Sequence, residues 1–466
     1  MVVSETLDLL RRELGDSVLT DEATLDGVRA DKSGARSANR PLAVIEARSV
    51  GDVQATMRIA SATGTPVVVR GAGTGLAGGA IGDAGEIVLS LTSLDRILEI
   101  SAADELAVVE PGILNGDLNA VLAEQGLWWA PDPASKAIAS VGGNIATNAG
   151  GILCAKYGVT REAVLGLAVV LADGSLVRFG HRTVKGVTGY DVTALMIGSE
   201  GTLGIVVEAT LKLRPLPSGT VATIGAFFPD IVTAAAASAA ITASGVRPAA
   251  LELLDALSLR LIDVYLGGQE GHVPIADRGG AYLLVQTDGD SSAEEATRIM
   301  GILAGFGADA DLTTDPDEGE RLLAVRRSAH PAFEKSGQVL IEDVAVPRSR
   351  LPEMFAAIET ISAETGLSIP VIAHAGDGNL HPNLIVPADL VRADGEIPDL
   401  VWDAADRMFT AAVALGGTLT GEHGVGILKR RWLADELGPD SYELQKRIKT
   451  AFDPQGILGP GRVFEF

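Results

Sequence analysis

The stretch VVVRGAGTGLAGGA (67–80) runs from an apolar strand into a loop with five glycines. It contains the spacing G-x-G-x-x-G at 73–78, and Asp95 follows about 20 residues later, as a Rossmann dinucleotide-binding unit requires. Further glycines and a second apolar run stand where a helix would have to begin, so we reject a Rossmann unit. The loop is either an ordinary glycine turn or an anion nest, in which successive backbone N–H groups bind phosphate and Arg70 adds positive charge.

Two more glycine-rich stretches favour a ligand-binding role for these loops. SVGGNIATNAGG (140–151) has four glycines, two asparagines and a threonine, and APDPAS (130–135) comes just before it. A third stretch, MIGSEGTLGI (196–205), lies further on. Glycine has no Cβ, so the backbone can approach a ligand closely. Three such loops among apolar strands indicate an extended ligand that lies along the backbone.

The composition is that of a folded, acidic protein. The chain has 466 residues, 47% of them hydrophobic, which is enough for two or three domain cores. Its net charge of −24 gives no general attraction to nucleic acid or to an anionic membrane. The single cysteine, Cys154, excludes an internal disulfide, a cysteine-ligated zinc finger and an iron–sulfur cluster held by four cysteines of this chain.

Neither secretion nor membrane insertion is predicted from the apolar segments. Residues 1–17 read as a short amphipathic helix and lack the unbroken apolar stretch and cleavage site of a signal peptide. The Ala-rich run at 231–244 is too short to span a bilayer. We therefore expect a cytoplasmic protein without a transmembrane segment.

The pattern of strands and helices changes near residue 217. Before it, short apolar strands alternate with turns, and the dipeptide Asp173-Gly174 predicts a hairpin. The run 202–217 ends in two prolines, which mark a boundary. From Thr220 onward, alternating strands and helices with several short strand–strand joins are typical of an α+β domain. The tail from Lys429 reads as helical.

Three of the six histidines fall in two compact motifs. His374 and His381 flank a Gly-Asp-Gly turn in HAGDGNLHPN (374–383), and Glu422 and His423 lie in TGEHGVG (420–426). If these two strands form a hairpin, both imidazoles of the first motif lie close together at the same end of it. Two His and one Glu with an open coordination position suit zinc or a similar divalent ion. The alternative is that these are loop and N-cap residues satisfied by backbone.

The glycine-rich segments RGAGTGLAGGA, PDPAS, SVGGNIATNAGG and GSEGTLGI together resemble the FAD-binding domain of the vanillyl-alcohol oxidase superfamily of flavoproteins. The resemblance implies that the first loop holds the FAD pyrophosphate and that the later stretches line the rest of the nucleotide. Some relatives attach FAD through a His in the first loop; this sequence has none there, which implies non-covalent FAD. The cofactor-binding residues so predicted are Arg70, Gly71, Ala72, Gly73, Thr74, Gly75, Gly78, Gly79, Pro131, Ser140, Gly143, Asn144, Thr147, Gly150, Glu200 and Ile205.

HAGDGNLH and GEHGVG resemble the C-terminal domain of the FAD-linked D-2-hydroxyacid dehydrogenases. That group includes D-lactate dehydrogenases, D-2-hydroxyglutarate dehydrogenases and the flavin subunit of glycolate oxidase. The resemblance implies that His374, His381 and Glu422 bind a divalent metal, with zinc as the expected ion. It also implies that His423 is the catalytic base and that Asn383 contacts substrate. The C-terminal DPQGILGPGR (453–462) departs from the usual ending of relatives, and we expect that end to be peripheral.

Arg326 in AVRRSAHPA (324–332) matches the family's carboxylate-binding arginine, whose planar fork suits this ligand. Arg327 is its neighbour, expected in solvent. His330 lies one turn beyond Arg326 on the same helix face. It either borders the substrate or is an ordinary half-buried histidine.

The resemblance implies an α+β fold in three parts. These are an FAD-binding domain (1–218), a substrate domain with an antiparallel sheet (219–425), and a helical C-terminal segment that returns to the FAD domain (426–466). The implied reaction is oxidation of a small D-2-hydroxy acid to the 2-oxo acid. A divalent ion lowers the pKa of the C2 hydroxyl, His423 accepts its proton, and the flavin accepts the hydride.

Substrate size rests on one position. Relatives that act on D-2-hydroxyglutarate carry a substrate-binding Lys where Ile341 stands in GQVLIED (337–343). An apolar residue leaves a second carboxylate without its cation, so D-lactate is favoured, with glycolate and 2-hydroxybutyrate next. Lys335, Arg348 or His330 are alternative sources of positive charge.

Several alternatives remain open at this point. The alternatives to a D-lactate dehydrogenase are a D-2-hydroxyglutarate dehydrogenase and the flavin subunit of glycolate oxidase. A remoter alternative is a transferase like alkyl-dihydroxyacetone-phosphate synthase, against which stand the single His of GEHGVG and the lack of a membrane-docking helix. The electron acceptor is a quinone, a cytochrome, electron transfer flavoprotein or dioxygen, and a membrane-bound acceptor would place the cytoplasmic protein at the membrane periphery.

Overall fold

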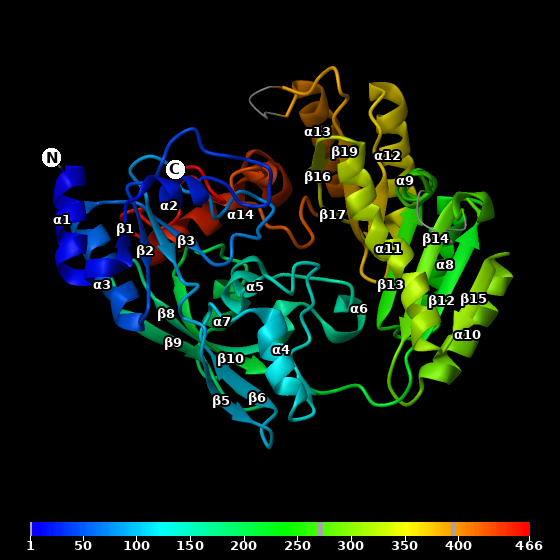
Figure 1. Cartoon of the computed structure of the whole chain (residues 1–466), viewed down its shortest axis with the longest axis horizontal. Coiled ribbons are helices and arrows are strands. Elements are labelled where there is room, and N and C mark those ends of the chain that lie inside the picture. Colours follow the sequence, from blue (N-terminus) through cyan, green and yellow to red (C-terminus); the bar gives the residue numbers. More distant parts are fainter. Residues whose placement is uncertain (1, 268–273, 393–396) are drawn as a thin grey trace. The chain divides into compact units, whose positions relative to one another are not determined.

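The computed structural model describes residues 2–267, 274–392 and 397–466, and these form two compact units (Figure 1). The first unit comprises residues 1–151, 158–216 and 422–466, and the second comprises 152–157 and 217–421. The short segment 152–157 thus belongs with the second unit although its neighbours in sequence belong with the first. The C-terminal part of the first unit begins at Glu422, four residues before the boundary that the family resemblance implied.

A four-stranded sheet carries the first glycine loop. Its order is β1-β2-β4-β3, with β2, β4 and β3 parallel. No helix follows β3: the chain passes through turns into β4, so the rejection of a Rossmann unit is confirmed. The elements of this part are α1 (Val2–Leu14), β1 (Val18–Leu19), α2 (Glu22–Gly27), β2 (Ala43–Glu46), α3 (Val50–Thr63), β3 (Val67–Arg70) and β4 (Ile87–Ser90).

A five-stranded antiparallel sheet completes the first unit, in the order β5-β6-β10-β8-β9. The predicted hairpin at Asp173-Gly174 is present as β8–β9. Fully buried Trp129 anchors the core beside this sheet. The elements are β5 (Ile97–Ser101), β6 (Leu106–Val109), α4 (Asn115–Ala123), β7 (Leu127–Trp128), α5 (Val141–Thr147), β8 (Val164–Val170), β9 (Leu176–Gly180), α7 (Val192–Met196), β10 (Ile205–Lys212) and β11 (Arg214–Pro215).

The C-terminal segment packs inside the first unit, and the expectation that it is peripheral is wrong. After α14 (Arg430–Phe452), Leu458 bridges to Val67 at the start of β3. Arg462 is 6% exposed and its guanidinium pairs with Glu86 through two bonds, 2.8 and 3.0 Å. Arg462 also donates to the carbonyls of Gly79 and Ile81. The segment therefore braces the end of the first glycine loop.

The second unit is built on an eight-stranded antiparallel sheet (Figure 1). Seven strands follow the order β15-β12-β14-β13-β18-β19-β16, and β17 pairs with β19. The strands are β12 (Ala222–Phe228), β13 (Ala250–Asp255), β14 (Ala281–Thr287), β15 (Asp309–Thr313), β16 (Val339–Ile341), β17 (Val344–Ala345), β18 (Val371–His374) and β19 (Asn379–Ile385).

Helices cover this sheet. On one face, α9 and α11 pack together over a core that contains Tyr282, Leu254 and Phe333. The predicted N-cap at Asp230 is confirmed, because its carboxylate accepts from the Thr233 N–H at 2.7 Å. The helices are α6 (Cys154–Tyr157), α8 (Ile231–Ala243), α9 (Ala256–Leu266), α10 (Ser292–Gly305), α11 (Pro316–Ser336), α12 (Leu351–Thr365) and α13 (Asp399–Ala414).

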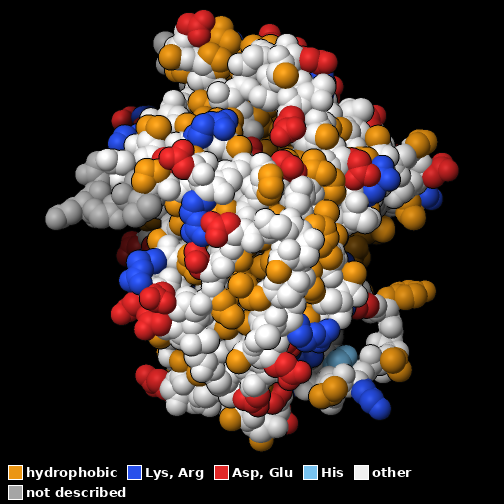
Figure 2. Space-filling model, turned by 90° about the vertical axis from the view of Figure 1, so that its right-hand side faces the viewer, with side chains coloured by type: hydrophobic (Ala, Val, Ile, Leu, Met, Phe, Trp, Pro, Cys, Tyr) orange, Lys and Arg blue, Asp and Glu red, His pale blue; other side chains and the backbone are white. Residues whose placement is uncertain are grey.

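No helix in the described part of the chain is both long and apolar, and the face of the molecule drawn in Figure 2 carries charges of both signs. Among the helices that the structure describes, none has the length and hydropathy needed to cross a membrane. On the face drawn in Figure 2, basic side chains are interspersed with acidic and apolar ones.

Candidate functional site

The first glycine loop adopts backbone conformations that favour glycine. Gly73 and Gly78 have φ of +71° and +77°. A Cβ at Gly71 would lie 2.5 Å from Ser140 Oγ at the start of α5, which shows how closely the first and second glycine loops approach. The loop thus has the close packing and exposed backbone that a phosphate cradle needs.

Arg70 braces this loop as well as bringing positive charge to it. Its Nη1 donates to the Ala80 carbonyl at 2.8 Å, and its guanidinium lies where a Cβ at Gly73 would stand. Burial lowers the pKa of Arg70, and the charge of Asp31 opposes this effect. The guanidinium therefore ties the two ends of the loop together.

The second loop supplies a buried donor that suits a nucleotide. Ser140 Oγ caps α5 by accepting from the Gly143 N–H, and Thr147 donates to the Gly143 carbonyl. The Pro131 carbonyl accepts from an asparagine side chain. Asn144 Nδ2 is buried and makes no hydrogen bond within the described chain. An orphaned amide beside a glycine cradle fits bound FAD.

Glu200 holds backbone through its carboxylate. It has a positive φ of 54°, and its two oxygens accept from the N–H groups of Val425 and Gly426, both at 2.8 Å. Burial raises its pKa to about 6, although these hydrogen bonds and Lys429 lower it. The Ile205 side chain, also predicted at the cofactor, packs in the core of the first unit. Neither side chain is available to contact the cofactor. The Glu200 carboxylate holds the turn after His423, and Ile205 could contact the cofactor only through its backbone.

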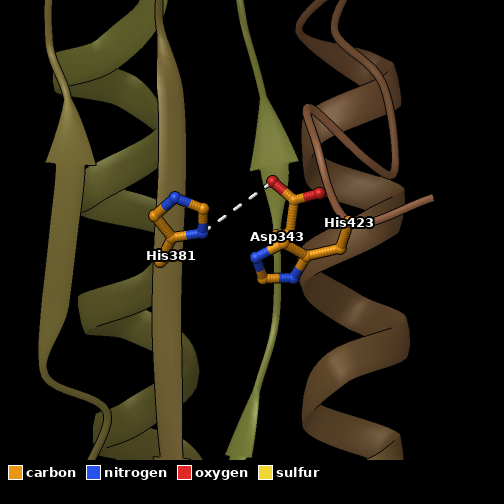
Figure 3. Close-up of side chains that lie close together, drawn as sticks. All are labelled: Asp343, His381 and His423. Atoms are coloured by element: carbon orange, nitrogen blue, oxygen red, sulfur yellow. Dashed lines mark ion pairs between the residues drawn. The ribbon is translucent and has the colours of Figure 1, made fainter. Parts of the chain in front are cut away.

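The predicted hairpin of His374 and His381 is confirmed in the second unit. β18 and β19 pair so that Ile372 faces His381 and His374 faces Asn379. Both histidines are buried, and their ring centroids lie 5.1 Å apart in an edge-to-face arrangement. His381 Nδ1 also lies 3.9 Å from Asp343 Oδ1 (Figure 3). Two imidazoles so close together are a suitable pair of metal ligands.

Glu252, which the sequence did not single out, joins two of the predicted residues. Its side chain is fully buried; Oε1 lies 2.6 Å from His374 Nδ1, and Oε2 accepts from Arg326 Nε at 2.7 Å. Burial by itself raises the pKa of Glu252, but His374 and Arg326 outweigh it, so the pKa lies below its usual value. A carboxylate inside the apolar-looking strand ALELLD was the only signal available in the sequence.

Asp343 is a second buried carboxylate that the sequence did not single out. Its oxygens accept from the Asn379 amide at 2.6 Å, the Thr420 hydroxyl at 2.7 Å and the Gly421 N–H at 2.9 Å. These bonds fix the end of the second unit's chain. Glu422 directly follows Gly421, so Asp343 fixes the backbone immediately before Glu422.

The other predicted substrate residues lie on α11 and β19. Asn383 is fully buried; its Nδ2 donates to the His381 carbonyl, and its Oδ1 has no hydrogen-bond partner among the described residues. Ile341 faces Asn383 directly across the β16–β19 pair. The pKa of His330 is lowered, mainly by burial, and His381 and Arg326 also lower it.

Glu422 and His423 open the C-terminal segment of the first unit. The Glu422 carboxylate lies 3.9 Å from His423 Nε2, and the side chains are 19% and 8% exposed. The second unit thus brings together His374, His381, Arg326, His330 and Asn383. The predicted cofactor residues, Glu422 and His423 belong to the first.

Two families match the sequence. Residues 41–180 match the FAD binding domain, and residues 219–463 match the C-terminal domain of FAD linked oxidases. Glycolate oxidase subunit GlcD of Bacillus subtilis is 39% identical over 428 residues, covering 91% of this chain and 89% of that protein. D-lactate dehydrogenase of Anaerostipes hadrus is 33% identical over 470 residues, covering 99% and 98%.

Solved structures show the same fold at low identity. p-Cresol methylhydroxylase has a TM-score of 0.79 at 18% identity, covering 100% of this chain and 98% of its own. Alkyldihydroxyacetonephosphate synthase has a TM-score of 0.74 at 19% identity, covering 98% and 84%. The fold is of the vanillyl-alcohol oxidase type, as the sequence predicted. The chain belongs to the family of FAD-linked oxidases and is an FAD-linked oxidoreductase.

Proposed function

We propose that this enzyme oxidises a small D-2-hydroxy acid, with D-lactate preferred, to the 2-oxo acid, using non-covalent FAD. The observation that carries the proposal is that one unit holds the paired rings of His374 and His381 together with Arg326, and that Glu252 bonds both His374 and Arg326. Relatives named D-lactate dehydrogenase and glycolate oxidase subunit support the same substrate class.

Arg326 is the proposed anchor for the C1 carboxylate. Its Nε is occupied by Glu252, which leaves the two terminal nitrogens for a fork-like pair of hydrogen bonds. Its side chain is 15% exposed, so the ion pair forms away from bulk water. Asn383 Oδ1 is a further buried acceptor in this unit.

A divalent ion, zinc by its ligand chemistry, is proposed on His374, His381 and Glu422. Two imidazoles and one carboxylate form the set that catalytic zinc sites use, with a position left open. Glu252 lies 2.6 Å from Nδ1 of His374, so Nε2 is the proposed ligand atom. When bound, such an ion acidifies a hydroxyl that it contacts.

His423 is the proposed base. It takes the proton of the substrate's C2 hydroxyl as the C2 hydride leaves, and FAD supplies the acceptor for that hydride. Glu200 holds the two residues that follow Gly424, and thereby limits the motion of the loop that carries the imidazole.

The choice of a monocarboxylate rests on Ile341. It faces Asn383 in the sheet and carries no charge for a distal carboxylate. Of the three alternative cations named from sequence, two are exposed: Lys335 lies 5.5 Å from the Tyr265 ring, and Arg348 is on the surface. The third, His330, is half-buried, and burial lowers its pKa and so disfavours its charged form. These environments support a pocket for small acids.

The test is a dye-coupled screen of D- and L-2-hydroxy acids with zinc analysis of the same sample. We expect D-lactate to be the best substrate and about one zinc per FAD. His381→Ala should lose zinc and turnover but keep FAD, whereas His181→Ala, in an exposed loop, should keep all three. Full activity of His381→Ala in the presence of a chelator would refute the metal role.

A second candidate is the flavin subunit of a glycolate oxidase. The 39% identity to GlcD of Bacillus subtilis favours it. Glycolate has the same carboxylate and hydroxyl as lactate without its methyl group, so the proposed residues serve both. Co-purification with an iron–sulfur partner would favour this candidate; dye-linked turnover by the isolated chain would count against it. The natural acceptor is proposed to be a quinone, a cytochrome or electron transfer flavoprotein.

A further inference from the structure

A glutamate is buried in the middle of the second unit's sheet, and packing of an apolar core does not explain a charged side chain there. Glu252 lies in β13 and its side chain is 0% exposed. Carboxylates are rarely fully buried unless they are paired, because removing their charge from water is expensive. Its partners should therefore show what the charge is for.

Glu252 contacts two of the predicted site residues, His374 and Arg326. It faces His374 directly across the β13–β18 pair, and its other oxygen reaches Arg326 on α11, which packs on the same face as Leu254. Each oxygen has its own partner, at 2.6 and 2.7 Å. A carboxylate only accepts hydrogen bonds, so His374 must carry its proton on Nδ1.

We propose that Glu252 is a positioning residue that couples the two halves of the substrate site: it orients His374 toward the metal and Arg326 toward the substrate carboxylate. This inference rests on the proposed function and adds a residue to it. A carboxylate on the far nitrogen of a ligating histidine fixes its tautomer and increases its basicity. The same carboxylate restrains the guanidinium, so that its terminal nitrogens are presented as a preformed fork.

The chain contains a matched control for this role. Asp255 lies three residues further along, half-buried at the end of the same strand. Its carboxylate caps α9 by accepting from the Ser258 N–H at 2.8 Å, and it contacts neither His374 nor Arg326. Burial raises the pKa of Asp255 to about 6. Asp255→Asn therefore perturbs the same strand without touching the proposed site.

The experiment uses the FAD-loaded full chain of the wild type, Glu252→Gln and Asp255→Asn. Zinc affinity is measured by competition with a chromophoric chelator, and KM for D-lactate is measured with a dye acceptor. The amide of Gln has one acceptor oxygen, so it serves one partner and not both. We expect Glu252→Gln to bind zinc about 10–100-fold more weakly, with a raised KM and unchanged FAD content. Asp255→Asn should keep the wild-type zinc affinity.

The outcomes separate the two proposals. Equal zinc affinity and KM in Glu252→Gln and wild type overturns the coupling role and leaves the proposed function intact. Absence of zinc binding or of D-2-hydroxy acid oxidation by the wild type overturns the proposed function and this inference together. If Glu252→Gln does not fold, Glu252→Asp replaces it. Its shortened carboxylate keeps the charge but cannot reach both partners, and zinc binding as tight as the wild type would again overturn the inference.

Discussion

Replacing Arg462 with Met should weaken FAD binding although Arg462 lies almost 400 residues from the first glycine loop in sequence. The side chain is 6% exposed and forms a two-bond pair with the equally buried Glu86. It also holds the carbonyls of Gly79 and Ile81, at the end of that loop. Met has a similar length and no charge, so it leaves Glu86 buried without its cation.

The expected size follows from that unpaired charge. Breaking a buried ion pair by removing one partner costs about 3–5 kcal/mol. If FAD binding must restore the loop, even about 3 kcal/mol corresponds to a rise in Kd of roughly 100-fold. The assay is titration of apoprotein with FAD, followed by flavin fluorescence. Circular dichroism checks that the variant is folded.

Two further variants make the test specific. Arg430→Met removes a cation from the same C-terminal region. Its ion-pair partner Glu465 is largely exposed and its other bond is to the neutral Gly461 carbonyl, so no charge is left buried and the Kd should change less than about threefold. Adding Glu86→Leu to Arg462→Met removes the unpaired carboxylate and should recover part of the affinity. Equal FAD affinity for Arg462→Met and Arg430→Met would show that the C-terminal segment does not brace the loop.

Four shorter predictions follow from the site. In the native protein the pKa of Glu200 is about 6, above its usual 4.5, so the native state binds more protons than the unfolded state between these two values. The free energy of unfolding should therefore fall by about 2 kcal/mol as the pH rises through this window. Glu200→Gln should lack this pH dependence in urea titrations. Arg326→Lys should raise KM for D-lactate more than Arg327→Lys, because Arg327 only pairs with Glu320 on the exposed surface; equal effects would place the carboxylate elsewhere. Ile341→Lys should improve D-2-hydroxyglutarate relative to D-lactate in kcat/KM, and a wild-type preference for the dicarboxylate would contradict the assignment of this position. Acid precipitation should release intact FAD into the supernatant, since the first loop has no histidine; flavin retained on the denatured chain would disprove non-covalent binding.

Local structure and the class of cofactor could be predicted from the residues alone. Loop 67–80 could be read because its glycines stand where L side chains are strained or would clash, as at Gly73 with φ +71°. The His374–His381 hairpin could be read because a Gly-Asp-Gly turn between two apolar strands leaves few alternatives. The N-cap at Asp230 depends only on the next three residues. In each case the interacting groups are close in sequence.

Which distant charges meet depends on how the strands and segments are arranged in the folded chain. Glu252 faces His374, 122 residues away, because β13 pairs on one side with β18, besides pairing on the other side with β14, the next strand in sequence. Asp343 reaches Thr420 and Gly421, and Arg462 reaches Glu86, through contacts that no local pattern encodes. Strand order and register determine such pairs, and a shift of one residue would turn each side chain to the opposite face of the sheet. The buried charges could therefore be noticed in the sequence, but their partners could be assigned only from the folded chain.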